Sequence, residues 1–507
     1  MLTGTVPRPV LCVTAHEHRD RARAEAVAAG VFTFAGETRT LGVEPDWLHA
    51  DLPADEEWRI DWVKFGYGLD LAAVGDRETW EGLVRSYIAA VPPDHDAAEV
   101  TARRILNWIY TWQALGLLSP GLDSELIASI AAQAEHVRRN LAPERNHRTL
   151  ELYALLIVAL ALDREAELLD FAIAELERNL AEDFRADGVH REASTHYHMI
   201  ALRSFVGAHA NCRRYGIELS AAYEERLGRA CDFALHCRRP DGTIPALSDA
   251  DGGDYSELLA LAGEALDRDD LRHGRAAATR NADFPAGGYF TQRGGWGADD
   301  PFLIFDCGPL GDGGHGHYDL LSVEVFAGGR PLLVDPGRFT YSEQPPNLRR
   351  WFRGTAAHNT VCVDGLDQTP YTRTRPAGPV AEGRFLGRTV RPGVDVLAGE
   401  ARSPVYDAVH QRRITLVEDR CWLIEDRLRA EQEHDYDLRF HLAPGEATIG
   451  DGTVRAPGLT LVILGASELR LEPGWIAPRY GERIAAPVVS AVRRARDHTF
   501  TTLVLPE

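Results

Sequence analysis

The chain has 507 residues, of which 45% are hydrophobic and 26% charged, and its formal net charge is −21. This length exceeds what one ordinary core can hold, so we expect two large folded domains, and the composition excludes extended disorder. A surface this acidic excludes a nucleic-acid partner, because phosphate binding needs a field of Lys and Arg. Any acidic substrate must therefore be met by a local basic patch.

The cysteines and the chain start indicate the compartment. The seven cysteines are scattered and form no CxxC pair, which is typical of a reducing compartment. The first 30 residues contain the charged run HEHRDRARAE and no apolar segment of signal-peptide length. No run of about 18 apolar residues occurs, so we predict no membrane partner and expect a cytoplasmic protein. An oligomer is compatible with these features.

After an N-terminal segment (residues 1–45), the pattern is helical as far as about residue 280. Apolar residues recur at three- and four-residue spacing, and Ala and Leu dominate. Short polar breaks predict antiparallel neighbours, and thus stacked helical hairpins around a shared centre. Residues 148–162 are apolar almost all round, as an inner helix would be. The predicted helical segments are 103–118, 124–141, 148–162, 165–184, 197–215 and 223–239.

After Arg280 the composition changes, and Gly, Pro and β-branched residues become frequent. Turn residues recur at roughly 8–12-residue intervals, the spacing of an antiparallel β-sandwich. We therefore predict a multidomain α + β protein whose helical domain ends near residues 275–285 and whose sandwich spans 281–507. The predicted strands are 302–308, 321–329, 331–337, 358–365, 410–419, 420–428, 436–444 and 459–466.

The densest polar cluster lies in residues 311–337, GDGGHGHYDLLSVEVFAGGRPLLVDPG. His315 and His317 are two positions apart, so in an extended chain both imidazoles lie on one side. Asp335 lies near the end of the predicted strand 331–337, and His358 begins the predicted strand 358–365. Imidazoles and a carboxylate from neighbouring strands predict a three-ligand metal site with room for water. The alternative is that these are separate polar loop residues.

A second cluster precedes the most apolar helix. Asn146, His147 and Arg148 stand where a helix start directs backbone donors and a positive dipole end toward an anion. Asn is also a common N-cap, which is the alternative interpretation of Asn146.

The third cluster, residues 188–205, leads into another helix and contains Tyr197 among His, Arg and Glu side chains. An aromatic residue at a helix start often only packs. Neighbouring Arg and His would, however, stabilise a tyrosinate, so we expect a lowered pKa for Tyr197. The polar loop 238–253 lacks EF-hand spacing, and we interpret Asp241, Asp249 and Asp251 as structural or rim-forming. Walker A, GxSxG and HExxH motifs are absent.

Together these segments resemble the heparinase II/III family of polysaccharide lyases over most of the chain. The sandwich signature is the most specific part, and Tyr318 departs from the Ala that the family often has there. The segments that carry the resemblance are GVFTFAGETRTLG with DW (31–47), the Asn-His pair at 146–147, the Tyr197 loop, GHGHYDLLSVEVFAGGRPLLVDPG (314–337), RGTAAHNTVCVDG (353–365) and YDLRFHLAPG (436–445).

The resemblance implies an (α/α) toroid over residues 46–280 followed by the sandwich. It implies cleavage of a uronic-acid glycan by β-elimination, leaving 4,5-unsaturated uronate ends. Tyr197 and His315 would then handle protons, while Asn146 and His147 would hold the substrate carboxylate. The metal ligands, for a structural zinc or comparable divalent ion, would be His317, Asp335 and His358. The substrate-binding residues would be Arg148, Arg191, Glu192 and Arg353, with Arg349 and Arg350 adding to the basic patch.

Three alternatives stay open. A hydrolase could use the predicted metal to activate water, and it would give saturated products. A carbohydrate-binding protein could use the same scaffold without turnover, since fold does not settle function. A related eliminase could act on a small substrate in the cytoplasm.

Overall fold

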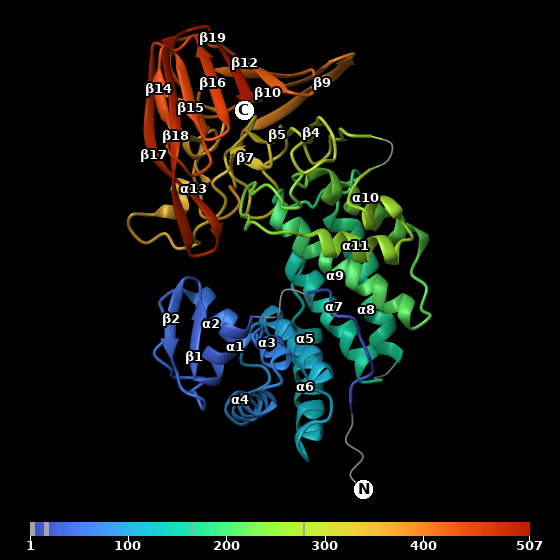
Figure 1. Ribbon diagram of the computed structural model, residues 1–507. Helices are drawn as coiled ribbons and strands as arrows, with labels where there is room; N and C mark the ends of the chain where they lie inside the picture. Colours follow the sequence, from blue (N-terminus) through green and yellow to red (C-terminus); the bar gives the residue numbers. More distant parts are fainter. Residues whose placement is uncertain (1–5, 15–19, 164–165, 277–278) are drawn as a thin grey trace. The chain divides into compact units, whose positions relative to one another are not determined.

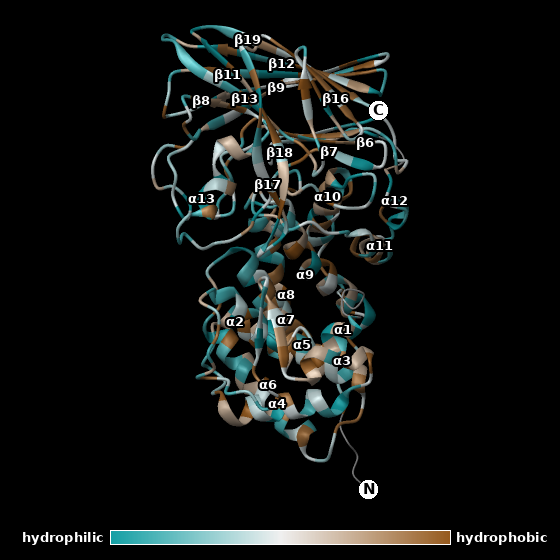
Figure 2. Ribbon diagram, turned by 60° about the vertical axis from the view of Figure 1, so that its left-hand side comes forward, coloured by the Kyte–Doolittle hydropathy of each residue, from teal (hydrophilic) through white to brown (hydrophobic). Residues whose placement is uncertain are grey.

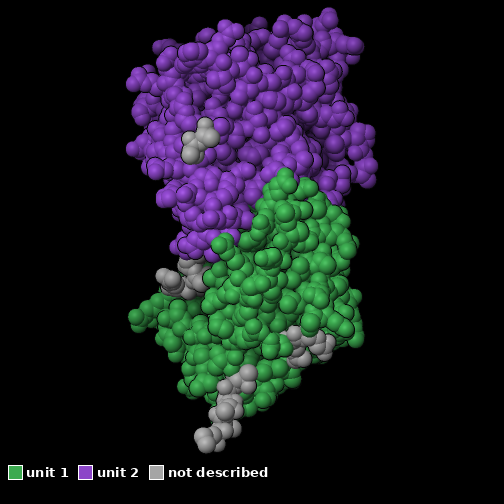
Figure 3. Space-filling view, turned by 90° about the vertical axis from the view of Figure 1, so that its right-hand side faces the viewer, with its two compact units in different colours: residues 1–183, 200–227 green, residues 184–199, 228–507 purple. Residues whose placement is uncertain are grey.

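The computed structural model describes residues 6–14, 20–163, 166–276 and 279–507 (Figure 1). The chain forms two compact units, and neither is a single stretch of sequence (Figure 3). Unit 1 contains residues 1–183 and 200–227, and unit 2 contains residues 184–199 and 228–507. The predicted domain limits follow the change from helices to strands and stay a prediction.

Unit 1 is mainly helical. A small hairpin pairs β1 (Val31–Phe34) with β2 (Glu37–Thr40). Helices α9 (Thr195–Arg214) and α10 (Ala221–Cys237) each contribute residues to both units. The other helices of unit 1 are α1 (Arg21–Ala28), α2 (Glu56–Val63), α3 (Gly68–Ala73), α4 (Arg77–Ala90), α5 (Ala98–Leu115), α6 (Leu122–Arg139), α7 (Arg145–Ala161) and α8 (Ala166–Asp183).

Helix α7 is the inner helix of this unit. Every residue from Thr149 to Ala161 is buried, and the helix contacts α5, α6 and α8. Hydrophobic and hydrophilic residues alternate along the neighbouring helices (Figure 2), as expected for helices with one face in a core. The prediction that residues 148–162 form a buried inner helix is confirmed.

The described residues of unit 2 form three antiparallel sheets. Their orders are β14-β15-β16-β19-β12-β11-β10-β9, β17-β18-β13-β8 and β3-β4-β5-β6-β7. Burial alternates with period two along β11, β12 and β13, so one face of these strands faces a core. That core includes Phe305, Ile414, Trp422, Phe440 and Phe500. The antiparallel fold predicted for this part of the chain is confirmed.

The bounds of the elements of unit 2 follow. Its helices are α11 (Ser256–Ala265), α12 (Asp269–Arg272), α13 (Leu348–Arg353) and the 3-10 turn η2 (Thr355–Ala357). Its strands are β3 (Asp283–Phe284), β4 (Tyr289–Arg293), β5 (Phe302–Asp306), β6 (Val323–Ala327), β7 (Arg330–Leu333), β8 (Val361–Val363), β9 (Glu382–Arg391), β10 (Val394–Arg402), β11 (Val409–Val417), β12 (Cys421–Arg429), β13 (His434–His441), β14 (Thr448–Gly450), β15 (Thr453–Ala456), β16 (Leu459–Leu464), β17 (Glu468–Arg479), β18 (Glu482–Ala495) and β19 (His498–Pro506).

Among the residues that the structure describes, no helix combines the length and the apolar character needed to cross a membrane.

Candidate functional site

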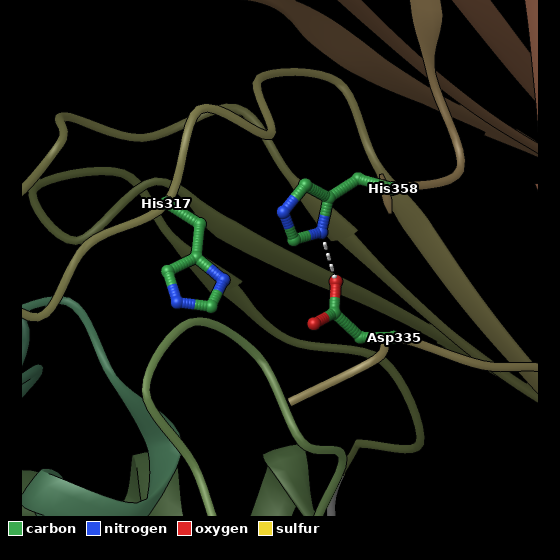
Figure 4. A group of neighbouring side chains, drawn as sticks. All are labelled: His317, Asp335 and His358. Atoms are coloured by element: carbon green, nitrogen blue, oxygen red, sulfur yellow. Dashed lines mark hydrogen bonds and ion pairs between the residues drawn. The ribbon is translucent and has the colours of Figure 1, made fainter. Parts of the chain in front are cut away.

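The three predicted metal ligands lie together in unit 2 (Figure 4). His317 comes from the loop between β5 and β6, Asp335 follows β7, and His358 follows η2. Their ligand atoms lie within 4.8 Å of one another, and all three residues are buried. The turn at Gly316 permits this arrangement, because a Cβ there would lie 1.8 Å from the carbonyl oxygen of Leu310.

The hydrogen bonds of the two histidines fit a divalent cation. His317 Nδ1 and His358 Nε2 are buried and have no hydrogen-bond partner among the described residues. His317 Nε2 lies 2.8 Å from Asp249 Oδ1, and His358 Nδ1 lies 2.7 Å from Asp335 Oδ2. A ligating imidazole usually gives its second N–H to a carboxylate in this way. The residues therefore suit a three-ligand metal site.

Asp249 contacts the predicted metal site, a contact that no sequence pattern indicated. Its carboxylate receives hydrogen bonds from His317 and from both terminal nitrogens of Arg349, with the Nη2–Oδ2 distance at 2.8 Å. Burial alone opposes ionisation, but Arg349 and His317 hold the pKa of Asp249 well below its ordinary value. Asp249 thus joins the metal ligands to Arg349 on α13, whereas its loop was expected only to be structural or rim-forming.

Next to this centre, Tyr197 and His315 are in direct contact. Their rings are stacked with centroids 3.7 Å apart and planes 16° apart. Tyr197 lies in the first turn of α9, and His315 lies two residues before His317. His315 Nδ1 lies 2.7 Å from Glu192 Oε2, and the Glu192 side chain is buried. The N–H donated to Glu192 leaves His315 Nε2 as the basic nitrogen.

The phenol of Tyr197 belongs to a chain of polar groups. Its hydroxyl lies 2.9 Å from the hydroxyl of Tyr341, and Arg338 Nη1 donates to that second hydroxyl at 2.7 Å. Arg338 is in turn paired with Asp251 at 2.7 Å. Sequence reasoning missed Tyr341 and Arg338, although both closely follow Asp335. Residues 338–341 contain no motif or regular spacing that would identify them as part of a site.

The expected direction of the Tyr197 pKa was wrong. Burial raises the pKa of Tyr197 to about 12, and this effect outweighs the opposing influence of Arg338 and of the hydrogen bond with Tyr341. Polar neighbours were visible in the sequence, but the burial of the phenol was not. The hydroxyl is therefore a proton donor at neutral pH.

Two of the predicted substrate-binding residues in this unit have other contacts. Arg353 is buried, and its Nε donates to the carbonyl of Gly316 at 2.9 Å, so it holds the segment between His315 and His317. Its Nη1 donates to the carbonyls of residues 372–374. Arg191 pairs with Asp312 at 2.9 Å. Their predicted contacts with substrate stay predictions.

The remaining predicted residues belong to unit 1. Helix α7 begins at Arg145 with Glu144 as its N-cap, so the alternative interpretation of Asn146 as the N-cap is wrong. Asn146 is buried in the first turn, and His147 is exposed. Arg148 pairs with Glu175 at 2.5 Å. The joint action of these residues with Tyr197 stays a prediction.

A cavity of about 340 Å³ opens in the same unit. It is lined by Leu150 of α7, by Asn107 and Arg103 of α5, and by Lys64 and Arg203. Cationic, anionic, amide and apolar groups thus share one hollow on the helical unit, and Lys64 is paired there with Asp61.

Both halves of the chain match known family models. Residues 13–267 match the model of the heparinase II/III N-terminus, and residues 276–501 match the heparinase II/III-like C-terminal model. A heparin-sulfate lyase of Pedobacter heparinus is 23% identical over 426 residues, covering 79% of this chain and 60% of the relative. A heparin-sulfate lyase of Bacteroides stercoris is 22% identical over 397 residues, covering 72% and 57%. The chain thus spans about six-tenths of the length of these relatives.

Solved structures share the fold. The crystal structure of heparinase III has a TM-score of 0.82 at 17% identity and covers 99% of this chain and 87% of that one. Heparan sulfate lyase HepC from Pedobacter heparinus has a TM-score of 0.65 at 20% identity, covering 98% and 83%. The predicted helical toroid followed by an antiparallel sandwich is confirmed by these neighbours. With both family models matched, the chain belongs to the heparinase II/III family.

Proposed function

We propose that the protein is a polysaccharide lyase that cleaves a uronic-acid glycan by β-elimination, leaving 4,5-unsaturated uronate ends. The observation that carries this proposal is the stack of the His315 imidazole on the Tyr197 phenol. It brings a base and an acid together, and β-elimination needs one group to take the proton from C5 and one to protonate the leaving oxygen O4. The names of the curated relatives, heparin-sulfate lyases, support an acidic glycosaminoglycan as substrate.

His315 is the base in this proposal. Glu192 accepts the Nδ1–H, so the tautomer with a free Nε2 lone pair is favoured. The carboxylate also stabilises the imidazolium that forms when His315 takes the C5 proton. Glu192 was predicted to bind substrate, but its burial and this hydrogen bond favour a role in positioning His315.

Tyr197 is the acid. Its raised pKa, about 12, keeps the hydroxyl protonated at neutral pH and able to donate to O4. The tyrosinate left behind accepts a hydrogen bond from Tyr341, whose oxygen already faces Arg338. Where the C5 proton and O4 lie on one face of the sugar, Tyr197 could serve as base as well as acid.

The developing enediolate needs donors on the substrate carboxylate. Asn146 and His147, in the first turn of α7, are proposed for that task because a helix start presents amide donors and a positive dipole end. Arg148 and Arg191 are proposed to attract the acidic chain, although each already pairs with a carboxylate.

We propose a structural divalent ion, zinc by its ligand set, for His317, Asp335 and His358. Such an ion would supply positive charge, and its three ligands would link the loops that carry them. The imidazoles of His317 and His358 are fully buried, which leaves substrate no approach to a metal-bound water. This burial disfavours the hydrolase alternative.

The test is turnover on a panel of heparan sulfate, hyaluronan, alginate, ulvan and short uronate oligomers. A lyase gives products with an ultraviolet-absorbing conjugated end, whereas a hydrolase gives saturated ones. Tyr197→Phe and His315→Ala should each lower kcat by about 100-fold or more while the protein stays folded. Tyr215→Phe, which removes a hydroxyl bonded to the carbonyl of Pro9, is the matched control and should retain full turnover. Saturated products, or unaltered turnover in both site variants, would overturn the proposal.

A further inference from the structure

The hairpin formed by β17 and β18 is fastened to the segment that carries Tyr341. Its turn residue Gly481 donates its N–H to the carbonyl of Phe339 at 2.9 Å, and Tyr341 donates its backbone N–H to the hydroxyl of Tyr480 at 3.3 Å. The rings of Tyr341 and Tyr480 lie 5.6 Å apart. The hairpin tip therefore lies beside Tyr341, whose hydroxyl contacts that of Tyr197.

Arg483 follows this turn and is held between aromatic rings. Its guanidinium carbon lies 5.2 Å from the ring centre of Phe339 and 5.1 Å from that of Trp475. The residue is exposed, and within the described part of the chain it forms no ion pair with a carboxylate. Stacking fixes the long side chain, so the entropic cost of ordering it on a ligand is reduced.

Arg338 differs from Arg483 in burial and in pairing. Arg338 also stacks on Tyr341 and Tyr480, but it is buried and its charge is offset by Asp251. Arg483 keeps its full charge at the surface of a chain whose net charge is −21. A fixed, uncompensated guanidinium is suited to a bidentate contact with a carboxylate or a sulfate.

Aromatic rings extend this surface. Trp475 and Trp351 meet edge to face with centroids 5.1 Å apart, and both are half-buried. The polarised C–H groups of a sugar ring can pack on such a face, as apolar groups do on aromatic rings. An arginine fork next to two indoles therefore matches an acidic sugar better than it matches a free anion.

We propose that Arg483, with Phe339, Trp475 and Trp351, forms a subsite for the acidic group of a sugar neighbouring the one that reacts. This inference rests on the proposed lyase function and deepens it by naming a recognition residue. The ligand group is a carboxylate or a sulfate, two anionic groups in which a pair of oxygens can accept two N–H groups of one guanidinium. Arg483 contacts no reacting atom in this scheme, so it contributes equally to ground-state and transition-state binding and acts on KM.

The experiment compares Arg483→Ala and Arg483→Lys with Arg494→Ala. Arg494 is on the same strand, is exposed, and pairs weakly with Glu433 and Asp435, so its removal matches the change in net charge. Arg483→Ala should raise KM, and the Kd of an acidic tetrasaccharide measured by calorimetry, about 5- to 10-fold with kcat within about twofold. Arg483→Lys should recover part of the affinity, because lysine keeps the charge but not the fork. Equal KM and Kd in wild type, Arg483→Ala and Arg494→Ala would overturn the subsite.

Two further comparisons identify the acidic group that Arg483 binds and distinguish a failure of this inference from a failure of the proposed function. The Kd ratio of Arg483→Ala to wild type is measured with a sulfated heparan oligosaccharide and with its unsulfated counterpart. A larger ratio for the sulfated ligand assigns sulfate, and equal ratios above one assign the carboxylate. Absence of turnover in wild type contradicts the lyase proposal alone, because the calorimetric comparison still decides whether Arg483 binds the acidic sugar.

Discussion

The hydroxyl of Tyr341 is hydrogen-bonded to the hydroxyl of Tyr197, with 2.9 Å between the two oxygens. Arg338 donates to the oxygen of Tyr341, so the single proton of Tyr341 is free to point at Tyr197. The second phenol is thereby oriented as a donor to the first. It is ready to stabilise negative charge on Tyr197 once that residue has given up its proton.

Tyr341→Phe should therefore lower kcat by about 10-fold, the loss of one hydrogen bond to a developing charge. KM should change little, because the interaction strengthens only as the tyrosinate forms. Steady-state kinetics on the best substrate of the panel would measure both constants. Tyr371→Phe, which removes an exposed hydroxyl bonded to Glu343, serves as the control. A kcat equal to that of wild type would contradict the role of Tyr341.

The raised pKa of Tyr197 predicts the alkaline side of the pH profile. With a pKa of about 12, the hydroxyl stays protonated as pH rises and loses its proton only near that value. Between about pH 7 and about pH 10, ionisation of Tyr197 should therefore cause no fall in kcat/KM. Stopped assays across this range, with folding monitored by circular dichroism, would measure the profile. A descending limb near pH 9 in folded enzyme would show that Tyr197 is not the acid or is less buried.

Glu192→Gln should lower kcat about 10-fold while preserving the shape of the buried side chain. The amide can still accept the N–H of His315 but no longer stabilises an imidazolium with a full charge. Glu192→Ala should lose more, because the ring then also loses the acceptor of its Nδ1–H. Kinetics of both variants beside thermal melts would separate positioning from loss of fold. A kcat of Glu192→Gln equal to that of wild type would argue against a role for charge.

His317→Ala should reduce both metal content and melting temperature. One of three ligands is lost and the carboxylate of Asp249 loses a partner, so we expect a decrease of several degrees, with metal falling from about one ion per chain to a small fraction. A chelator should shift wild type in the same direction. Elemental analysis and calorimetry provide the readouts, with exposed His273 as the site of a control His273→Ala substitution. Unchanged metal content in His317→Ala would rule out the proposed ligand set.

A buried network in the sandwich predicts acid sensitivity. Asp426 accepts hydrogen bonds from His410 at 2.7 Å and from Arg412 at 2.6 Å. Burial opposes its ionisation, but Arg412 and His410 lower the pKa of Asp426 to about 2, below the roughly 3.9 expected in an unfolded chain. Its contribution, about 2 kcal/mol, is therefore present above about pH 4 and is lost as pH falls toward 2. Burial also lowers the pKa of His410, so proton uptake by the unfolded chain destabilises the fold in the same direction.

Asp426→Asn should flatten this dependence. Chemical denaturation at several pH values between about 3 and about 7 would measure the free energy of unfolding of wild type and variant. The variant should be less stable at neutral pH and should approach wild type at the acidic end. Parallel curves for the two proteins would contradict the assignment.

Local sequence patterns predicted much of the fold. The apolar residues of α7 repeat around the whole helix, which specifies an inner helix without any long-range information. The sequence also drew attention to His315 and His317, which are two positions apart. Both lie in the described loop between β5 and β6, and each faces a different partner.

Partners that come from distant segments could not be predicted in this way. Asp249 is 68 residues from His317, and Tyr341 is 144 residues from Tyr197. Neither spacing carries a periodic signal, because such contacts depend on how loops pack. The predicted direction of the Tyr197 pKa shift was wrong for the same reason. Burial is a property of the folded chain, and its effect on this pKa outweighs that of the charged neighbours seen in the sequence.

The make-up of unit 2 has a consequence for protein engineering. Residues 184–199, which carry Glu192 and Tyr197, belong to unit 2 although the chain on either side of them belongs to unit 1. A gene cut near residue 280 therefore yields a carboxyl-terminal fragment that keeps the imidazole of His315 but lacks the phenol. Chimaeras between relatives have to exchange this short segment together with the strands, or Tyr197 and His315 come from sequences that were never selected together.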